Sequence, residues 1–478
     1  MRTASTCIYS LICWAIACGF PRPADVPSPD ADAGRDAALD APPDMGLVSS
    51  CTADEFIACE ANSARLCNST GDGTISRDCG FAGCNADAKR CNQCAPSSDA
   101  CSTVANELDH CGSDGLPAGH EACLLACNNT PAAHCAYLEP RYLADICDLA
   151  TTNPDFVVSN SASIDTGMDG SCTGGVVAQT GGPDICVVRH GTIVVTASGT
   201  LTASGSRALA LVADSALTID GVLDVGANTV LSGPGGGFFA SGDRPSSSDG
   251  GGGAGFATAG GNGGSAMQDG GGGHGGDRAT DPSLVSVLVG GARPTRAAAG
   301  GPQSGGAGGA ATLIACRGTV SVSGLIDAGG GGGLGGRPGT FSGSFFAGAG
   351  GGSGGNVVLQ GLSIRVTGQV FANGGGGGAG WLQGSTQFGQ PGSDGTRSAS
   401  ASAPGGVSLS GEGAGGAGGR LATAPGAGLH PTNASALPGA GGGSIGFFQT
   451  YTPAGAAIAL TPSAASPGFQ PNIAINTR

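Results

Sequence analysis

Residues 319–333 read TVSVSGLIDAGGGGG: two short alternations of small polar and apolar side chains, a Ser-Gly turn between them, and a glycine run. Alternation with a period of two is typical of β-strands. Strands of about four residues are too short for an ordinary sandwich, and no helical crossovers separate them. Stacked coils of a solenoid meet both conditions, because stacking buries the apolar side chains that a single coil would leave exposed. The stretch predicts a mainly β chain with a right-handed parallel β-helix or β-solenoid.

The same unit recurs along the C-terminal part of the chain. We place the solenoid at residues 184–478, with repeats near 208–226, 311–333, 356–378 and 441–460. Glycine runs flank the repeats, and 95 of the 478 residues are glycine. Without a Cβ, such runs can pack closely as extended polyproline-II-like segments, although collagen is excluded because there is no strict Gly-X-Y period. We expect polyglycine insertions packed in a lattice; the alternative is flexible loops.

Residues 51–147 form a cysteine-rich region with tandem six-cysteine units at 51–91 and 94–135, followed by a transition segment at 148–183. Small units of this kind need disulfides, because they bury little apolar surface. Six cysteines allow 15 pairings, and the spacing does not choose among them. We expect Cys147 to pair with Cys172 or Cys186. The disulfide candidates are Cys51, Cys59, Cys67, Cys79, Cys84, Cys91, Cys94, Cys101, Cys111, Cys123, Cys127, Cys135, Cys147, Cys172, Cys186 and Cys316.

The N-terminus is typical of an exported lipoprotein. Residues 1–17 combine an early arginine with a short apolar run, as in a signal peptide, and end in a lipobox-like Ala-Ile-Ala before Cys18. Cys18 is therefore the predicted lipidation site, and the anchor is the only expected membrane contact. Residues 19–50 are rich in Pro, Ala and Asp and predict an extended tether. We expect display at the outer membrane surface; the alternative is secretion.

These features together resemble glycine-rich, cysteine-rich surface lipoproteins of myxobacterial type. The resemblance rests on the lipobox, the Asp/Pro tether, the β-units that end in Ala and polyglycine, and the six-cysteine unit. The most specific part is Gly83-Cys84-Asn85 followed by Arg90-Cys91. The resemblance implies location and architecture rather than an activity.

Charge and motif content exclude several functional classes. The net charge is −15 and Lys89 is the only lysine, so no basic stripe is available for nucleic acid. Cys91 and Cys94 form a CxxC without a second pair at zinc-ribbon spacing, and structural disulfides explain them better. His274 and Asp277 lie in a glycine run but fit a calcium nonapeptide only in part. We therefore predict no cofactor and no metal site.

Carboxylates in the β-units are the candidates for catalysis. Parallel β-helices that act on polysaccharide place such groups on one face of adjacent coils. The candidates are Asp220, Asp224 and Asp327, and Arg189 and His190 are near in sequence. Asp224 and Asp327 occupy the same position in two copies of the unit, and the next copy has Phe371 there. A position that exchanges a carboxylate for phenylalanine is typical of a surface or a turn. We assign no catalytic residues.

The predicted function is that of a surface-displayed structural or adhesive lipoprotein without enzymatic activity, in contact with cell-surface polymer, polysaccharide or matrix. One alternative is a polysaccharide-binding or polysaccharide-degrading β-helix. Whether acidic and aromatic side chains converge on one face of the solenoid is the observation that discriminates this alternative. A second alternative is a protein-binding cysteine-rich module carried on a solenoid stalk.

Overall fold

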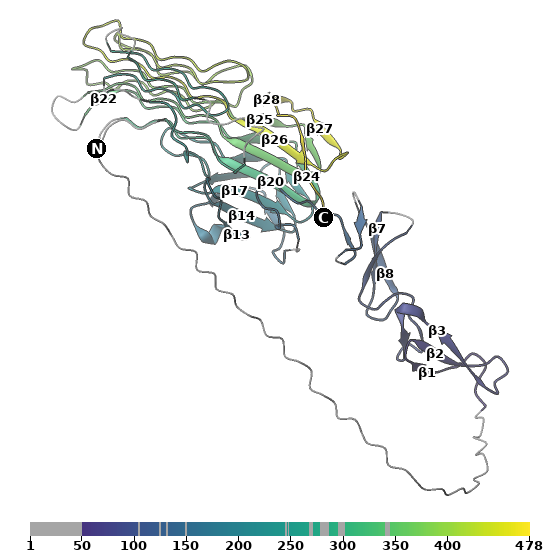
Figure 1. The fold of residues 1–478 in the computed structure, drawn as a ribbon. Coiled ribbons are helices and arrows are strands. Elements are labelled where there is room, and N and C mark those ends of the chain that lie inside the picture. Colours follow the sequence, from purple (N-terminus) through teal and green to yellow (C-terminus); the bar gives the residue numbers. More distant parts are fainter. Residues whose placement is uncertain are drawn as a thin grey trace, which may run out of the picture.

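The computed structural model describes residues 50–478 except 104–105, 124–125, 131, 149–150, 244–245, 247, 267–270, 278–285, 295–301 and 340–344. The predicted signal peptide, Cys18 and the tether lie outside the described residues. The described chain is mainly β, with small sheets in the cysteine-rich region and large parallel sheets after it (Figure 1). The predicted mainly β class with a β-solenoid is confirmed. No helix in the described residues is long and apolar enough to cross a membrane.

The two six-cysteine units have the same design. Each holds a three-stranded antiparallel sheet and a two-stranded ribbon. In each unit the first cysteine pairs with the third, the second with the fifth and the fourth with the sixth, which supports their being tandem copies. The disulfides are Cys51–Cys67, Cys59–Cys84 and Cys79–Cys91, then Cys94–Cys111, Cys101–Cys127 and Cys123–Cys135. The elements are β1 (Phe56–Glu60), β2 (Ser63–Cys67), β3 (Thr74–Asp78), the 3-10 helix η1 (Gly80–Ala82), β4 (Cys84–Asn85), β5 (Arg90–Cys91), β6 (Asp99–Cys101), β7 (Glu107–Cys111), β8 (Pro117–Ala122), β9 (Cys127–Asn128) and β10 (His134–Cys135).

The solenoid consists of stacked coils whose strands pair in parallel with the coil before and after. Its first coil, β11 (Phe156–Val158) and β12 (Ser161–Asp165), pairs with β15 and β16. The solenoid therefore starts within the segment 148–183 that the sequence analysis treated as a transition. The first coil was missed because β11 is short and β12 has a single large apolar residue, Ile164. The following elements are the 3-10 helix η2 (Asp169–Ser171), β13 (Gly175–Val177), β14 (Ile185–His190), β15 (Ile193–Val195), β16 (Thr200–Ser204), β17 (Ala208–Ala213), β18 (Leu217–Ile219), β19 (Val222–Asp224), β20 (Ala310–Val322), β21 (Leu325–Asp327), β24 (Asn356–Val366), β25 (Gln369–Phe371), β26 (Phe447–Thr452), β27 (Ile458–Leu460), β28 (Ala464–Ser466) and β29 (Ile473–Ala474).

The register of the coils follows the sequence repeats. Leu217 pairs with Val320, and Val320 pairs with Ile364, so equivalent residues of successive copies form one buried column. The inner columns are aliphatic and form a continuous core from Val158 to Phe448. One sheet, in the order β12-β16-β19-β21-β25-β28, forms a separate face of the solenoid. The alternation seen in the sequence thus decides which side chains face the core and which face outward.

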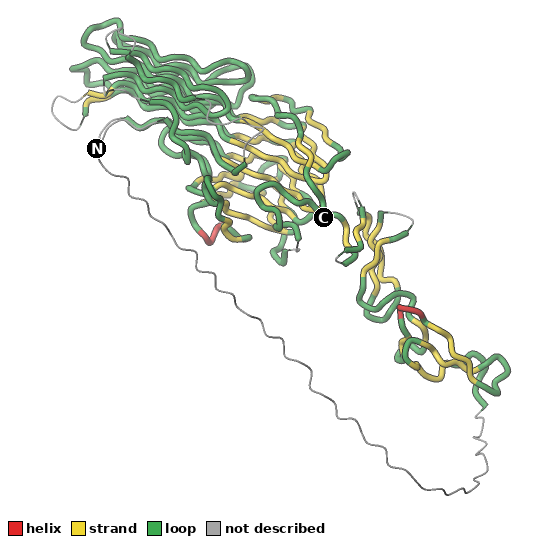
Figure 2. The backbone as a smooth tube through the Cα atoms, in the orientation of Figure 1, coloured by secondary structure: helices red, strands yellow, loops and turns green. Residues whose placement is uncertain are grey.

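Three long insertions build a second body, here called the glycine bundle: residues 225–309, 328–355 and 372–446. They leave the solenoid after β19, β21 and β25 and return at β20, β24 and β26. Figure 2 shows their extended segments running side by side as loops rather than strands. A short ribbon of β22 (Arg337–Pro338) and β23 (Phe345–Phe346) lies within them.

The central segment of the bundle, residues 374–380, has a three-residue period. Successive backbone N–H groups donate to three different neighbouring segments, over donor–acceptor distances of 2.8–3.0 Å, and every third one returns to the same neighbour. Three residues per turn without internal hydrogen bonds is the geometry of polyproline II. The N–H groups of Gly374, Gly377 and Gly380 donate to the carbonyls of Gly419, Gly416 and Gly413, respectively. Those of Gly375 and Gly378 donate to Gly352 and Ala349, and those of Gly376 and Ala379 donate to Ser393 and Gln390.

Packing on all sides explains why this segment is nearly pure glycine. Its carbonyls accept from three further segments, at Gly443, Gly333 and Gly406 among others, so neighbours surround it. A Cβ placed on Gly375 would overlap the backbone carbonyl of Gly331. Collagen needs glycine only at every third position because only one edge of each chain is crowded. Here all three edges are crowded, so the described part of the bundle is the ordered lattice rather than flexible loops.

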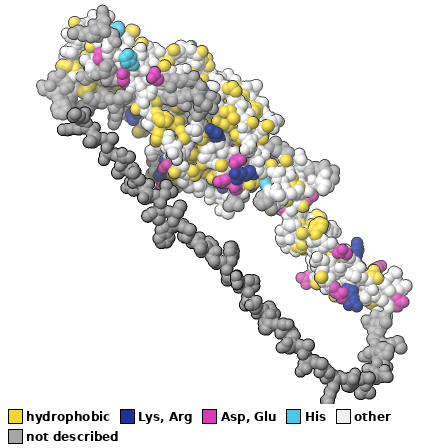
Figure 3. Space-filling model, in the orientation of Figure 1, with side chains coloured by type: hydrophobic (Ala, Val, Ile, Leu, Met, Phe, Trp, Pro, Cys, Tyr) yellow, Lys and Arg dark blue, Asp and Glu magenta, His cyan; other side chains and the backbone are white. Residues whose placement is uncertain are grey.

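The linker between the cysteine-rich region and the solenoid is fastened to both the fourth coil and the C-terminus. The Leu138 N–H donates to the Cys316 carbonyl over 3.0 Å, and Cys147 forms a disulfide with Cys316. Arg478 forms ion pairs with Glu139, Asp145 and Asp148, and charged side chains gather in this part of the surface in Figure 3. The expectation that Cys147 pairs with Cys172 or Cys186 was therefore wrong.

The physical reason for this error is the topology. Cys172 and Cys186 are bonded to each other across the loop between η2 and β14. Stacking brings β20 beside the linker although the two are far apart in sequence, and spacing along the chain carries no record of that proximity. The eight disulfides join all sixteen cysteines of the described residues. So many disulfides indicate an extracytoplasmic protein.

Candidate functional site

A column of polar side chains crosses the sheet β12-β16-β19-β21 on its outward face. Strand pairing places Ser163 beside Thr202, Thr202 beside Asp224, and Asp224 beside Asp327. The neighbouring residues Ile164, Ala203, Leu223 and Ile326 belong to the core, so alternation turns the column outward. Adjacent strands are about 4.8 Å apart, so the four side chains extend over about 15 Å.

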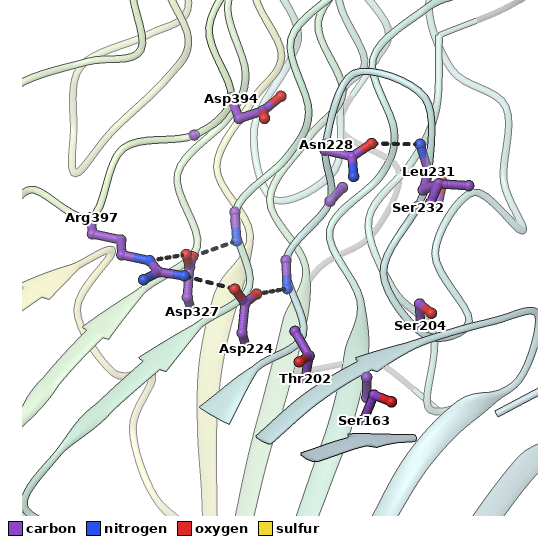
Figure 4. Close-up of a pocket in the computed structure, with 15 residues that line it drawn as sticks. Ser163, Thr202, Ser204, Asp224, Asn228, Leu231, Ser232, Asp327, Asp394 and Arg397 are labelled. Carbon is purple, nitrogen blue, oxygen red and sulfur yellow. Dashed lines mark hydrogen bonds and ion pairs between the residues drawn. The ribbon is translucent and has the colours of Figure 1, made fainter. Parts of the chain in front are cut away.

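Two segments of the glycine bundle turn this column into the floor of a groove. Residues 226–232 form one wall, and residues 394–397 form the other (Figure 4). The groove encloses a cavity of about 470 Å³ lined by serine, threonine, asparagine, aspartate and arginine side chains together with small residues and Leu231. Of the described residues that line the cavity, none is aromatic. We call this site the polar groove.

Two carboxylates in the polar groove share one guanidinium group. Arg397 Nη2 donates to Asp224 Oδ2 over 2.7 Å, and Arg397 Nε donates to Asp327 Oδ2 over 2.6 Å. The other oxygen of each carboxylate accepts from the backbone N–H two residues later, at Gly226 and Gly329, over 2.9 Å. The Asp-x-Gly turn at the end of each β-unit therefore orients its carboxylate, and Arg397 joins the two coils.

Burial changes the acid–base properties of the groove. It raises the pKa of the Asp327 carboxyl above its ordinary value, against the opposing effect of Arg397. Burial also raises the pKa of Asp394, whose carboxylate accepts a hydrogen bond from the Gly332 N–H. For Arg397, burial acts to lower the pKa, but the bonds to Asp327 and Asp224 outweigh it and raise the pKa.

The remaining residues considered for catalysis lie outside this groove. Asp220 is exposed and accepts a hydrogen bond from Ser323. Arg189 forms an ion pair with Asp214 at 2.9 Å, with both side chains largely buried. His190 stacks on Phe156 and bonds the Pro154 carbonyl over 2.7 Å.

The structure thus brings Asp224 and Asp327 together and leaves the other three candidates apart. Phe371, which follows Asp327 in the same column, is buried. Asp327 does form a turn, but the expectation of a surface position was wrong for it, because it is only 7% exposed. A segment of a later insertion covers it, and the repeat pattern could not reveal that cover.

Two further cavities lie outside the polar groove. One, of about 610 Å³, lies in the glycine bundle beside Asp243, His274 and Asp277. The other, of about 560 Å³, lies in the cysteine-rich region beside Phe81 and His110. Within the described residues, no group of three or more His, Cys, Asp or Glu side chains is placed to hold a metal ion.

Arg397 is the functional candidate that sequence reasoning missed. It lies 70 residues after Asp327, in the third insertion, within a stretch of serine, alanine and glycine. The only available signal was an arginine in an insertion that otherwise has few charges. Comparisons with protein-family models, curated proteins and solved structures find no match to this chain.

Proposed function

We propose that this chain is a surface-displayed structural and adhesive protein without enzymatic activity. The observation that carries the proposal is the glycine bundle, in which interior peptide groups bond to neighbouring segments. Such a body resists bending and local opening because each segment is held on several sides. It offers an extended surface, with the cysteine-rich region attached to the same solenoid through the docked linker.

Anchoring by a lipid on Cys18 completes the proposal. The disulfide content already indicates a location outside the cytoplasm. The tether, residues 19–50, would hold the folded part away from the membrane, and the lipobox ending at Cys18 supplies the attachment. Outer-membrane display is the arrangement in which an extended, disulfide-stapled surface can contact polymer or matrix.

The proposal that the protein has no enzymatic activity rests on how the carboxylates of Asp224 and Asp327 are paired. Asp224 and Asp327 both bond Arg397 and a backbone N–H, so the two carboxylates are held together as one ion-paired group. Pairing with a common guanidinium favours holding a ligand over transferring a proton to it. The hydrolysis of polysaccharide would require a pair of carboxyl groups that act separately as acid and base or nucleophile.

The test uses the native host. Cells that express wild type or Cys18→Ala are labelled with an alkyne fatty acid, and intact cells are treated with trypsin, which cuts after Arg35 in the tether. We expect label on the wild type only, release of the folded part by trypsin, and weaker attachment of a deletion strain to surfaces or neighbouring cells. Equal release of both forms without label would contradict the anchor. Unchanged attachment of the deletion strain would contradict the adhesive role.

The cysteine-rich region offers a second candidate, a protein-binding surface. Phe81 is 93% exposed beside the cavity of about 560 Å³ in that region. An exposed aromatic ring next to a cavity is a common anchor in protein interfaces. If this region carries adhesion, Phe81→Ala in the full chain will reduce attachment as much as deletion does. If attachment is unchanged, the solenoid and glycine bundle carry it.

A further inference from the structure

The polar groove combines hydrogen-bonding groups of several kinds on a rigid floor. Ser163 presents a hydroxyl group, which both donates and accepts. The Thr202 hydroxyl donates to the Ala162 carbonyl over 3.3 Å, and its oxygen accepts. Asp224 presents a carboxylate that Arg397 holds in place, and Arg397 also bonds the buried Asp327. The floor belongs to a parallel sheet of the solenoid, so the spacing between these groups is set by strand pairing rather than by mobile loops.

The walls add donors and small apolar contacts. Asn228 Oδ1 accepts from the Val230 and Leu231 N–H groups, over 3.0 and 2.9 Å, which orients its amide N–H groups as donors. Leu231 and Ala227 supply apolar surface beside these polar groups. Figure 4 shows Asn228 and Asp394 on the same side of Thr202 and Asp224, and the hydroxyl of Thr229, next to Asn228, donates to Asp394 over 3.5 Å.

The balance of charge selects among ligands. Asp224, Asp327 and Asp394 contribute three carboxyl groups, against the single guanidinium of Arg397. An anionic polymer would meet this excess of acidic groups and would find the guanidinium already paired. A neutral ligand with many hydroxyl groups can instead accept from the asparagine and donate to the carboxylates, because each hydroxyl does both.

We propose that the polar groove binds a neutral polysaccharide, which lies across the coils along Ser163, Thr202 and Asp224 and ends at the covered Asp327. The inference rests on the proposed adhesive function, since it names the polymer to which the protein adheres. The open floor from Ser163 to Asp224 is about 10 Å long, which favours a chain over a single sugar. Hydroxyl, carboxylate and amide groups recognise the ring hydroxyls, and Leu231 contacts the apolar face of a ring.

The test measures binding of the secreted full-length Cys18→Ser chain to a panel of neutral oligosaccharides: cello-, xylo-, manno- and malto-hexaose. Oligogalacturonate is the anionic comparison. Ser163→Trp fills the groove, and Ser161→Trp is the matched control, because Ser161 is exposed on the same strand but does not line the cavity. Thr202→Val removes one hydroxyl while keeping the shape of the side chain.

We expect saturable binding of at least one neutral oligosaccharide, loss of that binding in Ser163→Trp and its retention in Ser161→Trp. Thr202→Val should weaken it by about fivefold, the effect of one hydrogen bond. The proposal is overturned if no neutral oligosaccharide binds, if oligogalacturonate binds more tightly, or if Ser163→Trp binds as well as Ser161→Trp. None of these results bears on lipid labelling or on the attachment of the deletion strain, so failure of the groove and failure of the adhesive function are distinguishable.

Discussion

Replacing both Cys147 and Cys316 with alanine should destabilise the protein more than removing the other disulfide of the solenoid. The Cys147–Cys316 bond closes a loop of 169 residues, whereas Cys172–Cys186 closes one of 14. The loop-entropy relation gives about 5 kcal/mol for the first disulfide and about 3 kcal/mol for the second. All four cysteines are buried, so packing losses largely cancel in the comparison. The expected difference is about 2 kcal/mol, or about thirtyfold in the unfolding equilibrium.

The assay is urea unfolding of the two double variants and the wild type without reductant, followed by far-ultraviolet circular dichroism of the β-structure. The slope of free energy against urea reports how much surface unfolds, so it should be similar in the two variants if the same unit is lost. Equal losses of stability would refute the reasoning. The linker would then be held mainly by its apolar and ionic contacts, and the long loop would contribute little.

Three other predictions concern single residues. Gly375→Ala should lower the free energy of unfolding by about 1–3 kcal/mol, because the new methyl group overlaps fixed backbone, whereas Gly170→Ala, which meets no neighbour, should change it little in the same urea assay. Gln360→Leu should cost about 1–3 kcal/mol by thermal unfolding, because it leaves the Arg141 N–H and carbonyl without the amide that bonds both. The pKa of Asp394 is raised in the folded state, so its contribution to stability is full below its pKa in the unfolded state, about 4. The contribution is lost as the pH rises through the pKa of the folded state. Asp394→Asn should therefore flatten the decline of the melting temperature between about pH 3 and about pH 7.

The sequence predicted the solenoid because its repeats carry the register. Leu217, Val320 and Ile364 occupy one column, and each lies in the same place in a recognisable unit. The short alternation, the small turn and the following glycine run are all local patterns, so they can be recognised in the sequence without knowledge of the fold. The first coil was missed for the converse reason. In β12, Ile164 is the only large apolar residue, and the alternation is too weak to stand out from a loop.

The polar groove could be predicted only in part. Asp224 and Asp327 were matched by repeat position, and the structure places them side by side. Arg397 and the walls come from insertions whose path depends on the packing of the whole glycine bundle, a property without a local pattern. The same limit applies to Cys316. Its partner is decided by which coil stacks beside the linker, and that stacking is a long-range consequence of the fold.

The three-residue period of segment 374–380 determines which insertions and deletions the glycine bundle can accommodate. Each backbone N–H faces one of three neighbours, and the same neighbour returns after three residues. Insertion or deletion of three residues therefore leaves all the remaining peptide groups facing the same neighbouring segments, and only the end of the segment moves. A change of one or two residues rotates the rest of the segment by a third or two thirds of a turn. Homologous bundles should therefore differ in length by multiples of three residues, in the way that coiled coils vary by heptads.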